Sequence, residues 1–110
     1  MQEIASSTVA EVIILARELD RAEREFDAFI GSLNESEQAA LVALMWIGRG
    51  AFDAEDWDEA FATAQSEART PTAGYLKGSP HLADHLESGL EALGISATDE
   101  EDQLYRSGET

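Results

Sequence analysis

The residues of this chain best suited to chemistry are two histidines that stand four positions apart. His81, Asp84 and His85 form the pattern His-x-x-Asp-His. Two histidines at this spacing share one face of a helix and can hold a zinc ion, as in an inverted zinc-protease motif with Asp in place of Glu. The spacing indicates no third ligand, so the alternative is a solvated first helical turn beside a partly buried His85. We expect no cofactor.

A second candidate site is an arginine between two glycines. Arg49 follows a strongly apolar run and is flanked by Gly48 and Gly50. Its guanidinium could bind an anion or another small ligand near exposed backbone N–H groups, with Trp46 and Tyr75 lining the same pocket. The alternative is that Arg49 pairs with a nearby acid or caps helix carbonyls, and that both aromatic residues belong to the core.

The composition narrows the classes of function. A chain of 110 residues with 44% hydrophobic residues has the size of one folded domain. It has no cysteine, which excludes disulfides, thiolate metal sites and thiol catalysis. Its net charge of −16 opposes binding to nucleic acids and to anionic membranes, and suits a basic protein partner. No signal peptide is evident, so we expect a cytoplasmic protein.

Helix start and stop signals predict an all-α fold, a compact bundle of about four helices. Asn34 with Glu37 has the pattern of a capping box, and Ser79 before Pro80 that of a helix N-cap. Nine consecutive apolar residues at 39–47 must be buried, either in the middle of the fold or between chains. The predicted helices span residues 8–30, 35–47, 54–68 and 80–93, and the second of them is the central, apolar one.

The distribution of apolar and acidic residues further predicts a single helical domain over residues 1–95 and a disordered acidic tail over 96–110. Ile13 and Ile14 lie off the main apolar stripe of the first predicted helix. Together with the apolar run they provide more apolar surface than a four-helix monomer needs to bury. We therefore expect a homodimer with Ile13 and Ile14 at its interface.

Two segments carry a family resemblance. They are Leu-Met-Trp-Ile-Gly-Arg-Gly at 44–50 and Tyr-Leu-Lys-Gly at 75–78, the latter followed by Pro-His-Leu-Ala-Asp at 80–84. Through them the chain resembles a small bacterial family of unknown function over about residues 33–94. The resemblance implies a small all-helical bacterial protein and carries over no activity.

Two classes of function follow from the sequence. The first is a small acidic, non-enzymatic interaction protein that acts as a homodimer. The alternative is a protein or enzyme that binds a small ligand, an anion or a metal, with Arg49 or the pair His81 and His85 at its site.

Overall fold

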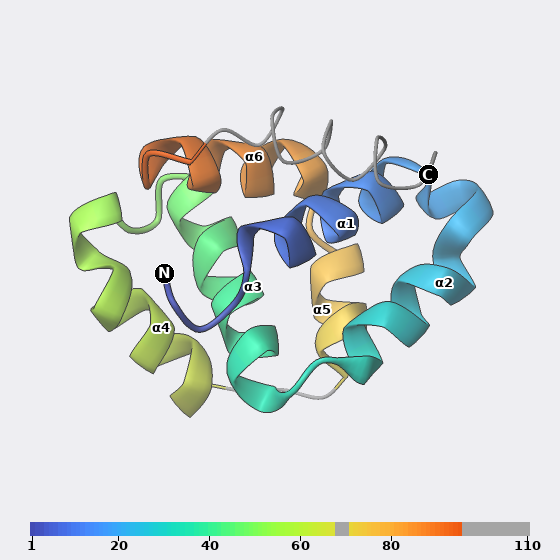
Figure 1. The fold of residues 1–110 in the computed structure, drawn as a ribbon, viewed down its shortest axis with the longest axis horizontal. Helices are drawn as coiled ribbons and strands as arrows, with labels where there is room; N and C mark the ends of the chain where they lie inside the picture. Colours follow the sequence, from blue (N-terminus) through green and yellow to red (C-terminus); the bar gives the residue numbers. More distant parts are fainter. Residues whose placement is uncertain (68–70, 96–110) are drawn as a thin grey trace.

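The chain folds into helices throughout the part that the structure describes. The computed structural model describes residues 1–67 and 71–95, and over these it has six α-helices, a short 3₁₀ helix and no strand. The elements are α1 (Ser6–Arg17), α2 (Leu19–Ser32), α3 (Glu35–Gly48), η1 (Ala54–Asp56), α4 (Trp57–Ser66), α5 (Thr72–Lys77) and α6 (Leu82–Ala92) (Figure 1). The predicted all-α class is confirmed, but the number of helices exceeds the expected four. The predicted acidic tail lies outside the described residues.

The apolar helix α3 occupies the middle of the molecule, as predicted. It packs against α6 and α4, while α1 packs against α6 and α2, and α2 packs against α5. Figure 1 shows α3 between α4 on one side and α1 and α5 on the other. Every residue of the run at 39–47 is buried except Val42, which is half-buried. The run is therefore buried within a single chain.

Both ends of α3 have the signals that the sequence indicated. Asn34 Oδ1 accepts a hydrogen bond from the Glu37 N–H at 2.8 Å, and Glu37 Oε1 accepts one from the Asn34 N–H at 3.0 Å. The predicted capping box is thus confirmed. At the other end, Gly50 has a φ of +87°, and the following N–H, that of Ala51, bonds back to the Trp46 carbonyl at 2.9 Å. This is the left-handed helix stop that glycine favours.

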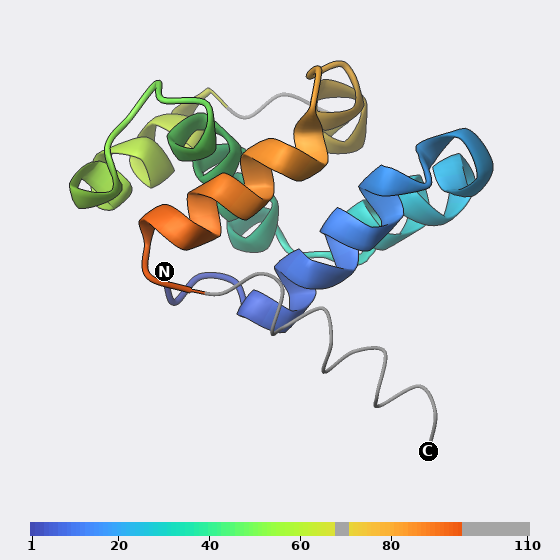
Figure 2. The same cartoon turned by 90° about the horizontal axis from the view of Figure 1, so that it is seen from above.

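The single helix predicted over 8–30 is wrong, because the chain breaks there into α1 and α2. Glu18 has φ −111° and ψ 22°, and Ala22 is also non-helical. Figure 2 shows α2 turning back beside α1 after the break. One straight helix of this length would extend about 35 Å. The break instead lets Ile13 of α1 and Phe26 of α2 enter one core.

The last two predicted helices also differ in their starts. The segment at 54–68 opens with the 3₁₀ turn η1 before α4. The helix expected from residue 80 begins at Leu82, and its N-cap is His81, in the left-handed region with φ +59°. Ser79 is therefore not the cap of α6, and its N–H instead bonds to the Leu76 carbonyl at 3.0 Å, which closes the turn after α5.

Candidate functional site

A groove of about 260 Å³ lies between α3, α4 and α5. Two of the three residues predicted for a ligand site, Trp46 and Tyr75, line it together. The full lining comes from one face of α3, the last part of α4 and the first part of α5: Glu35, Gln38, Ala39, Val42, Trp46, Ala64, Gln65, Glu67, Thr72 and Tyr75.

The floor of the groove is an apolar strip along α3. Ala39, Val42 and Trp46 recur at spacings of three and four residues, so they lie on one face of the helix. Ala64 of α4 faces the same groove. The small side chains of Ala39 and Ala64 leave room that larger residues would fill, and Val42 remains half-buried as a result. The small alanine side chains thus leave the groove open beside the contact between α3 and α4.

Trp46 and Tyr75 are joined by a hydrogen bond at the edge of this floor. The Trp46 indole N–H donates to the Tyr75 hydroxyl oxygen at 3.0 Å, and the Phe52 ring stacks on the indole with centroids 5.7 Å apart. Trp46 is 9% exposed, whereas Tyr75 is 38% exposed. Within the described part of the chain the phenolic hydrogen of Tyr75 has no acceptor, so it can donate to a ligand.

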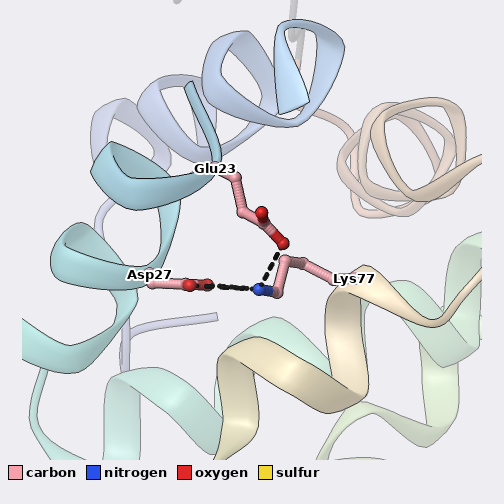
Figure 3. A network of polar contacts seen from close by, with 3 residues as sticks. All are labelled: Glu23, Asp27 and Lys77. Carbon is pink, nitrogen blue, oxygen red and sulfur yellow. Dashed lines mark hydrogen bonds and ion pairs between the residues drawn. The ribbon is translucent and has the colours of Figure 1, made fainter. Parts of the chain in front are cut away.

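An ion-pair cluster positions the helix that carries Tyr75. Lys77 of α5 places its Nζ 2.9 Å from Glu23 Oε2 and 2.9 Å from Asp27 Oδ1, both on α2 (Figure 3). Hydrogen bonds to Asp27 and Glu23 raise the pKa of Lys77 above its ordinary value. This cluster ties α5 to α2 and so fixes one wall of the groove.

The charges on the groove are negative. Glu35, the first residue of α3, and Glu67, just after α4, both line it and are exposed. No lysine, arginine or histidine is among the described residues that line the groove. Small-molecule sites usually measure about 300–1,000 Å³. The groove lies just below that range and carries carboxylates, so it suits a small cationic group with an apolar part.

Arg49 is not part of this groove. It is exposed at the C-cap of α3, and its backbone N–H bonds to the Met45 carbonyl at 3.0 Å. The structure therefore brings Trp46 and Tyr75 together and leaves Arg49 outside, so the predicted group of three does not form one pocket.

The two histidines lie at the start of α6, away from the groove. The His81 side chain is 77% exposed, and its Nδ1 is 4.0 Å from Asp84 Oδ2. The His81 and His85 rings meet edge to face with centroids 6.5 Å apart. Over residues 1–67 and 71–95, no group of three or more histidine, cysteine or acidic side chains is placed to hold a metal ion.

The residues predicted for a dimer interface are also placed by the structure. Ile13 is fully buried inside the core of this chain, and Ile14 is half-buried. Ile13 is therefore not available for contact with a second copy. The surplus apolar surface that led to the prediction of a dimer is mostly covered within one chain.

Sequence reasoning missed the polar part of the groove, which comprises Glu35, Gln38, Gln65, Glu67 and Thr72. One signal was present, since Glu35, Gln38, Val42 and Trp46 follow a helical spacing along α3. The continuous apolar run concealed it, because a helix that is apolar on all sides does not show which face is left open.

One family profile matches the chain over residues 23–95, and that family is described as Protein of unknown function (DUF3775). The match begins within α2 and ends just after α6, so it includes the whole groove and the Lys77 cluster but not α1. No curated protein and no solved structure matches the chain. Among the described helices, none has both the length and the apolar character required to cross a bilayer.

Proposed function

The chain belongs to the DUF3775 family, and we propose that it is a non-enzymatic interaction protein that binds a basic segment of a partner protein. The binding site in this proposal is the groove between α3, α4 and α5. The observation that carries it is the combination of an apolar floor with two carboxylates, Glu35 and Glu67, and no basic side chain among the described lining residues.

The surface charge of the whole chain supports a basic partner. A net charge of −16 attracts cationic segments over a distance and repels acidic ones. Charge alone gives weak and unspecific attraction, which falls as salt screens it. The apolar floor around Val42 and Trp46 adds a contact that salt does not screen, and it gives the attraction a defined place on the surface.

The side chains on which the alternative function depends are not on the groove. Arg49, His81 and His85, which would supply anion, metal or acid–base chemistry in the alternative function, lie elsewhere on the molecule. Tyr75 and Trp46 supply a hydroxyl group and ring surfaces, which suit recognition. A binding role therefore uses the groove as it is built, whereas the alternative function relies on Arg49 and the two histidines, which are not among the described residues that line it.

A homodimer is not required by this proposal. Because Ile13 is buried within the chain, a contact through α1 would depend on the half-buried Ile14. Self-association through α1 remains a prediction from the sequence.

The proposal is tested with a labelled dodecapeptide of alternating lysine and alanine, titrated into the full-length chain near physiological ionic strength. Val42→Lys puts a cation into the groove, and Ser88→Lys makes the same change of charge on the exposed surface of α6. We expect Val42→Lys to weaken peptide binding at least about tenfold and Ser88→Lys to weaken it less than about threefold, as fluorescence anisotropy would show. Equal loss in both variants, or no binding by the wild type, would overturn the proposal.

A further inference from the structure

We propose that the group held by the groove is the side chain of one lysine of the partner. This inference rests on the proposed function and names the ligand of the same site. A lysine joins a four-carbon apolar stem to a compact ammonium group with three hydrogen-bond donors. The groove has the matching order of surfaces, an apolar strip on α3 followed by carboxylates at the ends of α3 and α4.

The stem of the lysine fits the floor. Lysine side chains commonly lay their methylene groups along apolar surface and keep the charged end at the rim. Val42 and Glu35 are seven residues apart on α3, which corresponds to roughly 10 Å along the helix axis. A lysine spans roughly 6 Å from Cα to Nζ by ordinary bond lengths, and a hydrogen bond adds about 3 Å. A stem lying on Val42 therefore brings its ammonium within reach of Glu35.

The ammonium suits two carboxylates that come from different elements. Glu35 belongs to α3, and Glu67 follows the end of α4. Figure 1 shows the start of α3 and the end of α4 both reaching the lower edge of the molecule. A planar guanidinium favours two parallel bonds to one carboxylate, whereas an ammonium donates in three directions. Lys77 of this same chain shows the arrangement, with its Nζ between Glu23 and Asp27 (Figure 3).

Tyr75 completes the site from α5. Its oxygen accepts a hydrogen bond from the Trp46 indole N–H at 3.0 Å. Among the described residues nothing accepts the hydrogen of the Tyr75 hydroxyl, so this hydrogen can be donated to a ligand. When a lysine side chain of the partner lies in the groove, the ligand atoms that can accept this hydrogen are the backbone carbonyl oxygens of that lysine. The Tyr75 hydroxyl thereby favours a lysine within a peptide over a free amine.

The test uses capped pentapeptides that carry lysine, arginine or norleucine at the central position, titrated into the isotope-labelled full-length chain and followed by NMR. Norleucine keeps an apolar stem of the same length and lacks the charge. We expect the lysine peptide to bind at least about tenfold more tightly than the norleucine peptide, and at least about threefold more tightly than the arginine peptide. Equal binding of lysine and norleucine, or of lysine and arginine, would overturn the inference.

Variants of the carboxylates provide a second, independent result. Glu35→Gln with Glu67→Gln keeps the shape of the groove and removes both charges. Glu25→Gln with Glu91→Gln removes the same charge from exposed positions on α2 and α6. We expect the first pair of substitutions to lower the affinity for the lysine peptide about tenfold and the second pair to lower it less than about twofold. Both variants should keep the helical content of the wild type. Equal effects would place the lysine elsewhere.

Three further outcomes complete the test, and the last two separate this inference from the function on which it rests. If free n-butylamine, which has the four-carbon stem and the single ammonium of a lysine side chain but no backbone, binds as tightly as the lysine peptide, the ligand is a small amine and the inference is overturned. If the alternating dodecapeptide binds in a Val42-dependent way while lysine, arginine and norleucine pentapeptides bind equally, the proposed function stands and the lysine assignment falls. If the dodecapeptide does not bind, both fall.

Discussion

A Cβ atom built on Gly48 would lie 1.7 Å from the carbonyl oxygen of His85, so α3 and α6 meet here backbone to backbone. A second close contact lies one helical turn away, where a Cβ on Gly89 would lie 2.5 Å from the Leu44 carbonyl oxygen. Residues two apart on a helix point roughly 200° apart. Trp46 is two residues from both Leu44 and Gly48, so the groove face of α3 lies on the far side of the helix from α6.

The first prediction concerns this close contact. Gly48→Ala should destabilise the fold by about 3 kcal/mol or more, because the clash is with backbone and α6 must move to relieve it. Gly31→Ala provides the control, since nothing lies within 4 Å of its Cβ position inside α2. That change should be neutral or stabilise by up to about 1 kcal/mol. Urea unfolding measures both, and equal midpoints would show that the two helices are not in backbone contact.

The second prediction concerns the Lys77 cluster. Lys77→Met should lower the melting temperature more than Arg24→Met, which removes the same charge from an exposed position on α2. The folded pKa of Lys77 is raised above its ordinary value of 10.5, so its contribution is complete below that pH and is lost as the pH rises through the folded pKa. The difference between wild type and Lys77→Met should therefore stay constant between about pH 7 and pH 9 and shrink in stronger alkali. A difference that fades already near neutral pH would contradict this account.

The third prediction separates the structural role of Trp46 from that of Tyr75. Trp46→Ala should cost about 3–5 kcal/mol, because the indole is almost fully buried and is stacked by Phe52. Tyr75→Phe should cost less than about 1 kcal/mol, because the tyrosine is exposed and water can replace its hydroxyl at the indole N–H. Denaturant unfolding measures both costs. If Trp46→Ala cost less than about 1 kcal/mol, the indole would not anchor the core.

The fourth prediction addresses self-association through α1. If the sequence-based prediction of a dimer holds, Ile14→Glu should reduce the mass measured by light scattering from two chains to one and keep the helical content. The reason is that a symmetric contact would place two new carboxylates close together on a protein of charge −16. A wild type that is monomeric at tens of micromolar, or a variant with unchanged mass, would disprove the dimer.

The sequence predicted the parts of this fold that depend on local signals. The capping box of Asn34 and Glu37 and the glycine stop at Gly50 are short-range features, and the structure has both. The break at Glu18 has no such signal, since neither glycine nor proline stands there. The break accompanies the packing of α1 against α2 and α6, which a pattern along one helix does not contain.

The candidate site was predictable only in part, for a similar reason. Trp46 and Tyr75 were placed in one pocket on the basis of residue type, and they do line one groove. Arg49 was added because it follows the same apolar run, but its position at the C-cap turns it away from the groove lining. Glu67 could not be anticipated, because its role depends on where the end of α4 lies relative to α3.

The most direct measurement of the central claim uses the two indole N–H signals in the NMR spectrum of the isotope-labelled chain. Trp46 lines the groove, whereas the Trp57 indole N–H donates to Glu3 Oε1 at 3.0 Å and is not part of the lining. The signals are assigned with a Trp57→Phe variant. On addition of the alternating lysine and alanine dodecapeptide, we expect the Trp46 signal to shift in a saturable way and the Trp57 signal to stay in place. A Trp46 signal that does not move, or that moves no more than that of Trp57, would contradict binding in the groove.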